Sequence, residues 1–175
     1  MGESASGAVP DRHPDEHVRF ARYRRALASV APDEAVALVA RVLTDPDPTV
    51  ANSAVCEYLD RRAAELLTDP GYPAWCRELT GPVAVDDFTA RRLREWTLLR
   101  AIALGEPWDA EQVLTASNWL QLRLAAESRD AAALAALAGG GRTRRIRSTA
   151  GSRIPQPVPP PRQSSIPPAQ KGPHS

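Results

Sequence analysis

Apolar residues recur along most of the chain with the spacing of a helix. Phe20, Tyr23, Leu27 and Val30 fall at positions i, i+3, i+7 and i+10, which places them on one helical face. Similar apolar stripes follow up to residue 150, separated by breaks rich in Pro, Gly and Asp. Nowhere do apolar and polar residues alternate between hairpin turns, as strands would require. The pattern predicts an all-α fold.

Turn and capping residues set the predicted bounds of these helices. The sequence Asp45-Pro46-Asp47-Pro48 ends one helix and starts the next, since the proline ring interrupts the helical hydrogen bonds. Gly81-Pro82 predicts a further break, and Gly105 predicts the end of a long helix. The predicted helices span residues 15–30, 32–43, 48–67, 75–79, 86–104, 109–114, 117–124, 130–138 and 143–150.

Each predicted helix has an apolar face that we expect to be buried. In the segment 86–104 this face consists of Phe88, Leu93, Trp96, Leu99 and Ile102. In the segment 117–124 the apolar residues are Trp119, Leu120, Leu122 and Leu124. Burial of these stripes between neighbouring helices is the expected source of the core.

One short pattern recurs within the helices: an aliphatic residue followed four positions later by a small one. It occurs at Val50/Ala54, Leu93/Thr97, Leu122/Ala126 and Ile146/Ala150, with Arg after the aliphatic residue in the last three copies. The small residue lets a neighbouring helix approach closely, while the aliphatic residue fills the adjoining space. The separations of 43, 29 and 24 residues indicate a divergent array rather than a strict repeat.

The stretch from Glu34 through the Asp-Pro-Asp-Pro turn to Ala54 resembles a HEAT repeat. That family has a first helix, an Asp-Pro-rich turn, and a second helix opening with Val-Arg and a small residue; here Ala51 stands in the Arg position. The segments 90–105 and 141–147 resemble those of HEAT-like proteins from actinobacteria. The resemblance implies a short α-solenoid of antiparallel helix pairs and a bacterial origin, and it implies no reaction or ligand. A TPR array is the alternative architecture, but its 34-residue pattern of Trp, Gly and Tyr is not visible.

Composition divides the chain into three parts. Residues 1–14 are small, polar and Pro-containing, and predict a disordered N-terminal tail. Residues 15–150 form the predicted helical repeat domain. Residues 151–175 include eight Pro and few apolar residues, and predict a disordered, basic, Pro-rich tail.

Charge is distributed unevenly along the chain. Residues 1–138 hold 15 Arg and all 21 acidic residues, a net charge of −6, whereas residues 139–175 carry +7 and no acid. Such asymmetry predicts an interaction segment, which can bind either an anionic partner or the chain's own acidic body. The candidate contacts with an anionic partner are Arg142, Arg144, Arg145, Arg147 and Arg153.

Several other classes of protein are disfavoured by the sequence. No apolar run approaches the length of a membrane span, and the N-terminus does not resemble a signal peptide, so we expect a cytoplasmic protein that contacts no membrane. Two cysteines, Cys56 and Cys76, do not make a disulfide framework, and a redox pair is a remote alternative.

Two motifs with chemical associations have simpler explanations. His13-Pro14-Asp15-Glu16-His17 fits a zinc-protease string, but it lies where a polar tail meets the first helix, as ordinary helix-start residues do. Gly139-Gly140-Gly141 lacks both the preceding strand and the Lys of a phosphate-binding loop. We therefore predict no catalytic residue, no metal site, no cofactor and no small-molecule ligand.

The sequence favours a non-enzymatic protein–protein interaction scaffold whose partner is unknown. The alternative is nucleic-acid binding through the Arg-rich segment 139–153. A more distant alternative is a DNA-repair enzyme, because HEAT-like alkylpurine DNA glycosylases use a concave surface with Trp and a carboxylate. Trp96 and Trp119 are the residues that such an activity would involve.

Overall fold

The computed structural model describes residues 15–154, which form nine α-helices and no strand. The all-α prediction is confirmed for this part of the chain. The predicted N-terminal tail and residues 155–175 of the predicted C-terminal tail lie outside the described residues. The helices are α1 (Glu16–Ser29), α2 (Pro32–Val42), α3 (Pro48–Glu65), α4 (Tyr72–Val83), α5 (Asp87–Leu104), α6 (Ala110–Thr115), α7 (Asn118–Glu127), α8 (Ala131–Gly140) and α9 (Arg144–Arg153).

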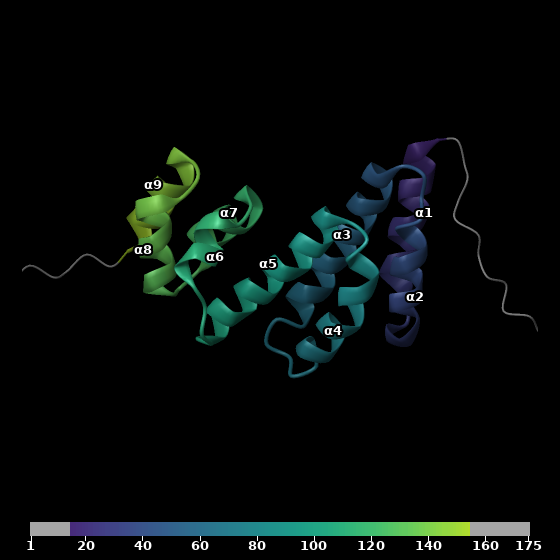
Figure 1. Ribbon diagram of the computed structural model, residues 1–175, viewed down its shortest axis with the longest axis horizontal. Helices are drawn as coiled ribbons and strands as arrows, with labels where there is room; N and C mark the ends of the chain where they lie inside the picture. The colour runs from purple at the N-terminus through teal and green to yellow at the C-terminus, as the bar shows by residue number, and fades with distance from the viewer. Residues whose placement is uncertain (1–14, 155–175) are drawn as a thin grey trace, which may run out of the picture.

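Alternate helices pack side by side. Helix α1 packs on α3, α3 on α5, α5 on α7 and α7 on α9, so the odd-numbered helices form one row. In addition, α2 packs on α4 and α6 packs on α8. The body is elongated, with α1 near one end and α8 and α9 at the other (Figure 1).

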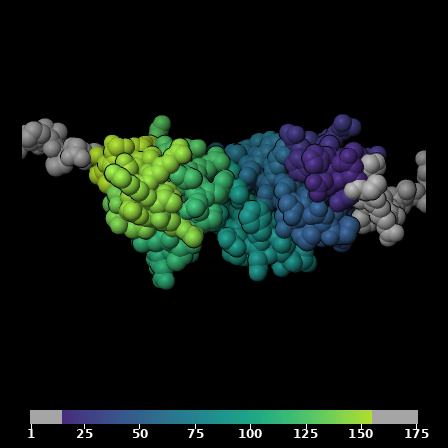
Figure 2. All heavy atoms as spheres, turned by 90° about the horizontal axis from the view of Figure 1, so that it is seen from above, coloured from purple at the N-terminus to yellow at the C-terminus, as the bar shows by residue number. Residues whose placement is uncertain are grey.

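The core consists of two clusters, and α3, α4 and α5 contribute residues to both. An N-terminal cluster includes Leu27, Val39, Leu59 and Leu93, and a C-terminal cluster includes Trp96 and its neighbours from α6 to α9. Figure 2 shows a notch between the yellow and green C-terminal half and the teal to purple N-terminal half. Helix α5 crosses this junction, because Leu93 belongs to the first cluster and Trp96 to the second.

Local capping signals determine several helix ends. The Asp47 carboxylate accepts hydrogen bonds from the backbone N–H groups of Thr49 and Val50, which begins α3 as the Asp-Pro turn predicts. Asp86 caps α5 in the same way. Gly105 ends α5 with a φ of +69°, a left-handed conformation that favours glycine.

The predicted break at Gly81-Pro82 is wrong. Helix α4 spans Tyr72–Val83 and contains Pro82 in its last turn, so it is longer than the predicted segment 75–79. Proline has no N–H to donate to the carbonyl four residues earlier, but so near the end of a helix this removes a single bond. The helix therefore continues through Pro82 and stops one residue later.

Two predicted core residues are exposed instead. The exposed fraction is 49% for Phe88 and 38% for Leu122. Helix α7 begins beside the middle of α5, where Ser117 binds Glu95 and Trp119 contacts Arg92. The first turn of α5, which contains Phe88, therefore has one side open to solvent. Leu122 lies about 200° around α7 from the buried Leu120, given 100° per residue, and so points outward.

Burial differs between the copies of the aliphatic–small pattern. Both residues are buried at Val50/Ala54 and at Ile146/Ala150, as predicted. Leu93 is buried, but Thr97 is exposed. At Leu122/Ala126 both residues are exposed, so the interpretation of this copy as a packing contact is wrong.

The connector between the last two helices is shorter than predicted. Helix α8 continues through Gly139 and Gly140, and α9 runs to Arg153, three residues past the predicted domain end at residue 150. A Cβ on Gly141 would lie 2.6 Å from the Leu137 carbonyl oxygen and 2.6 Å from Ile146 Cγ2. This turn thus requires glycine at position 141 for space.

Within residues 15–154, none of the helices combines the length and the apolar character that a membrane crossing requires.

Candidate functional site

One surface of α5 and α7 combines aromatic, aliphatic and arginine side chains. We call it the Arg–Trp surface and define it as Phe88 and Arg92 of α5 with Trp119, Leu122 and Arg123 of α7. Phe88 and Leu122 are among the most exposed large apolar side chains of the described residues, and Trp119 is half-buried. Apolar side chains left in water together with arginine are typical of a binding surface.

Stacked guanidinium groups organise this surface. The Arg92 Cζ atom lies 3.9 Å from the centroid of the Trp119 ring and 6.0 Å from that of Phe88. The Arg123 Cζ atom lies 5.9 Å from the Trp119 centroid and 4.6 Å from that of Trp96. A cation over an aromatic face is attracted by the ring quadrupole, so these side chains hold one another in place.

A carboxylate from α3 fixes the orientation of Arg92. The Nη1 atom of Arg92 donates to Asp60 Oδ1 at 3.1 Å and to Oδ2 at 2.9 Å. The indole Nε1 of Trp96 donates to Asp60 Oδ1 at 2.7 Å. Because Asp60 is on α3 while both donors are on α5, this group couples two neighbouring helices of the row.

A second carboxylate positions the start of α7. Glu95 is buried in α5, and its Oε1 accepts from the Ser117 backbone N–H at 2.6 Å while its Oε2 accepts from the Ser117 hydroxyl at 2.9 Å. Ser117 is the N-cap residue of α7, but its hydroxyl binds Glu95 rather than an amide of its own helix. The negative charge lies at the N-terminus of α7, where the helix dipole favours it.

The predicted cluster of five arginines divides into two groups. Three of them donate to backbone carbonyls: Arg142 Nη1 to Ala116 at 3.1 Å, Arg147 Nη1 to Gly141 at 2.6 Å, and Arg153 Nη1 to Ala125 at 3.0 Å. These bonds satisfy carbonyls that have no partner within their own helix. Arg144 and Arg145 are exposed, and no hydrogen bond, ion pair or ring contact is found for them among residues 15–154.

Gln121 connects the Arg-rich connector to the core. Its side chain is fully buried, and its Nε2 lies within hydrogen-bond distance of three carbonyl oxygens at the end of α6, with the closest two, Val113 and Leu114, at 2.9 Å. Its Oε1 accepts from the Arg142 backbone N–H at 2.9 Å. The sequence alone gave no sign of this role, since a Gln within an apolar helix is ordinarily expected at the surface.

The structure brings Trp96, Trp119 and the Asp60 carboxylate together, but their contacts with one another join neighbouring helices. Trp96 is fully buried, so its ring offers no face to a ligand. Both oxygens of Asp60 accept hydrogen bonds from α5. Trp119 is the member of the pair that reaches the surface.

The two cysteines are free. Cys56 is buried, and its burial raises the pKa of the thiol to about 12, while Arg92 acts in the opposite direction. A thiol with such a pKa is protonated near neutral pH, so Cys56 is not a nucleophile.

The zinc-protease string is only partly within the described residues, since His13 lies outside them. His17 is exposed near the start of α1, with Nδ1 at 3.6 Å from Glu16 Oε1 and 3.8 Å from Asp15 Oδ1. Among residues 15–154, no group of three or more His, Cys, Asp or Glu side chains is placed to hold a metal ion.

No protein-family model, curated protein or solved structure matches the chain. The resemblance to HEAT repeats thus stays a prediction from the sequence, and arguments about function depend on the geometry described above.

Proposed function

We propose that this chain is a non-enzymatic scaffold of HEAT-like repeats that binds a protein partner in the cytoplasm through the Arg–Trp surface. The packing of each odd-numbered helix on the next, with α2 on α4 and α6 on α8, is expected of stacked helix pairs. A stack of this kind buries one face of each helix and leaves an extended surface for a partner.

The observation that carries the proposal is the exposure of Phe88, Trp119 and Leu122 around two stacked arginines. Aromatic residues and arginine contribute most of the affinity at protein interfaces, especially where they are held rigidly. Here Asp60 holds Arg92, and Glu127 holds Arg123 through an ion pair of 3.1 Å. The side chains that would meet a partner are thus already ordered.

The first test is the double variant Phe88→Glu/Leu122→Glu. Both side chains are exposed, so we expect thermal stability to stay close to that of the wild type. The full-length protein, immobilised and exposed to extract of its source cells, should retain a partner that the double variant loses.

The matched control is Leu104→Glu, which changes another exposed large apolar residue at the far end of α5. It should retain the same partner as the wild type. Equal retention by the double variant, or equal loss by the control, would contradict the assignment of this surface.

Nucleic-acid binding is a second candidate function, favoured by one observation. Arg144 and Arg145 are exposed, lack partners among the described residues, and belong to a stretch that contains no acidic residue from Ala131 to Ile154. Opposing it, three of the five predicted contact arginines are engaged with backbone carbonyls. A DNA-glycosylase-like activity is less favoured, because Trp96 is buried and Asp60 is bonded to α5.

Retention on immobilised DNA tests this second candidate. If Arg144 and Arg145 contact phosphates, Arg144→Ala/Arg145→Ala should reduce the slope of log affinity against log salt by about 2. Arg91→Ala/Arg94→Ala is the control, since it removes two exposed arginines from α5. An unchanged slope for the first variant would rule out the α9 arginines as the contact.

A further inference from the structure

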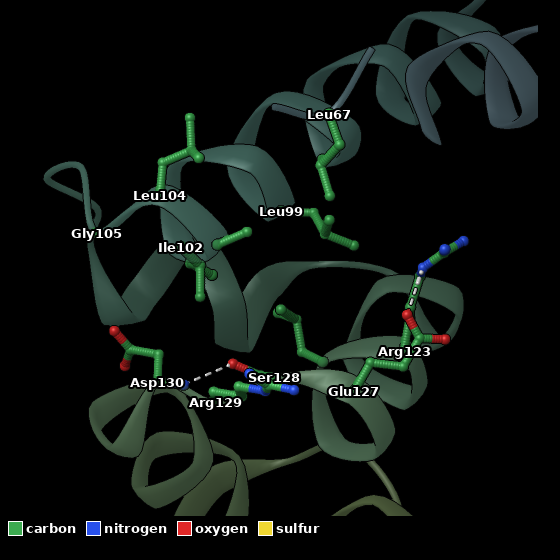
Figure 3. Close-up of a pocket in the computed structure, with 12 residues that line it drawn as sticks. Leu67, Leu99, Ile102, Leu104, Gly105, Arg123, Glu127, Ser128, Arg129 and Asp130 are labelled. Carbon is green, nitrogen blue, oxygen red and sulfur yellow. Dashed lines mark hydrogen bonds and ion pairs between the residues drawn. The ribbon is translucent and has the colours of Figure 1, made fainter. Parts of the chain in front are cut away.

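A second surface feature lies between the C-terminal half of α5 and the end of α7. Arg123 is the one residue that it shares with the Arg–Trp surface. This feature is a groove of about 520 Å³. Its apolar lining includes the buried Leu99 and Ile102 from α5 and Leu124 from α7, with Leu67 beside Leu99 (Figure 3). Binding sites for small molecules in proteins have volumes of about 300–1,000 Å³ and are mainly apolar, so the groove has suitable size and lining.

Charged residues form one edge of this groove, opposite Leu99 and Ile102 (Figure 3). Glu127 forms its ion pair with Arg123 of the same helix at 3.1 Å. Asp130 is the N-cap of α8, where its Oδ1 accepts from the Ala133 backbone N–H at 2.8 Å. Both carboxylates on this edge are thus engaged with groups of the protein.

Arg129 differs from these neighbours. Its side chain lines the groove and is exposed, and none of the residues 15–154 forms a hydrogen bond, ion pair or ring contact with it. Its guanidinium is therefore available to an anion at the edge of an apolar groove. A hydrogen bond between arginine and a carboxylate is charge-assisted and among the stronger ones that proteins make.

We propose that this groove binds a small monoanionic amphiphile, an unbranched aliphatic chain with a terminal carboxylate. The chain lies over the floor formed by Leu99, Ile102 and Leu124 and against Leu67 and Leu104, and the exposed Leu104 and half-buried Leu67 supply apolar surface that otherwise contacts water. The carboxylate binds Arg129. The ligand is a free molecule in solution and not the surface of a bilayer.

Three matched probes test the proposal by calorimetry on the full chain, each below its micelle concentration. They are decanoate, decanol and decyltrimethylammonium, which share a ten-carbon chain and differ in the charge of the head group. Decanoate should bind at a single class of site, decanol more weakly, and decyltrimethylammonium least. Equal affinity for all three would overturn the proposal, as would binding to anionic vesicles without binding of monomeric decanoate.

Two variants locate the binding. Arg129→Ala should weaken decanoate about tenfold, the value of one charge-assisted hydrogen bond, and leave decanol unchanged. Ala103→Trp should weaken both, because Ala103 is exposed on α5 and lines the groove, so that a large ring there occupies it. The control Arg144→Ala removes another unpartnered arginine, on α9, and should bind decanoate like the wild type.

Thermal melting of each variant confirms that it is folded. Decanoate affinity that is the same for Arg129→Ala as for Arg144→Ala would overturn the assignment of the carboxylate to Arg129. Unchanged binding to folded Ala103→Trp would exclude the groove. Since neither Arg129 nor Ala103 belongs to the Arg–Trp surface, these results are separate from those of the partner-binding test.

Discussion

Asp45→Ala is expected to lower the free energy of unfolding by about 3–5 kcal/mol, the usual effect of removing one member of a buried ion pair. The Asp45 side chain is fully buried, and its Oδ2 accepts from Arg19 Nε at 3.1 Å and from the Tyr23 hydroxyl at 2.7 Å. Its Oδ1 accepts from the Asp47 backbone N–H at 2.8 Å. The substitution leaves three donors without this acceptor, between α1 and the turn from α2 to α3.

Urea unfolding followed by circular dichroism measures this loss. The control is Asp47→Ala in the same turn, which removes an N-cap and a longer contact with Arg19 at 4.0 Å, and should reduce stability by only about 1 kcal/mol. If the two variants lose similar stability, Asp45 acts only as a turn residue and the buried contact with Arg19 is of little importance.

Trp96→Ala is expected to lower the free energy of unfolding by about 3–5 kcal/mol as well, since it removes the largest fully buried side chain of the described residues. The cavity lies where α5 meets α7. The substitution also removes the indole N–H that donates to Asp60 and the aromatic ring over which Arg123 lies. Because Trp96 belongs to the C-terminal core cluster, we expect the C-terminal half to be weakened most.

Hydrogen exchange and urea unfolding check this expectation together. Trp96→Phe is the control: it keeps an aromatic ring but lacks the indole N–H, and should cost clearly less than the alanine variant. Exchange should accelerate in α7 and α9 more than in α1 and α2. A uniform acceleration along the chain would show that α5 does not divide the molecule into two halves.

Helix positions and several helix ends were predictable from the sequence because their signals are local. The spacing of Phe20, Tyr23 and Leu27 identifies α1 from a window of a few residues. Asp47 and Gly105 act on amides and carbonyls within one turn of themselves, so they have the same effect in any fold. The break predicted at Pro82 was wrong because the free-energy cost of a proline in a helix depends on how near it lies to the helix end.

The candidate site was predictable only in part. The sequence drew attention to Trp96 and Trp119, but it could not distinguish the buried one from the one at the surface. The periodicity predicted that Phe88 and Leu122 lie in the core, but both are exposed and belong to the proposed partner-binding surface. Periodicity shows which residues share a helical face, but it does not show how far along that face a neighbouring helix extends.

The sequence by itself determined that this protein is helical, where most of its helices begin and end, and which segment is richest in arginine, since each of these follows from nearby residues and composition. The tertiary structure alone decided what the charged residues do. Asp45 and Asp47 lie two positions apart in one turn, yet the Asp45 side chain is fully buried against Arg19 and Tyr23 of α1, whereas Asp47 is partly exposed, caps α3 and lies 4.0 Å from Arg19. Likewise Arg142 binds a carbonyl of Ala116, whereas Arg144 remains in solvent without a partner among the described residues. The physical reason is that a charge is stabilised or left available by groups brought to it from other helices, and those contacts exist only once the helices have packed.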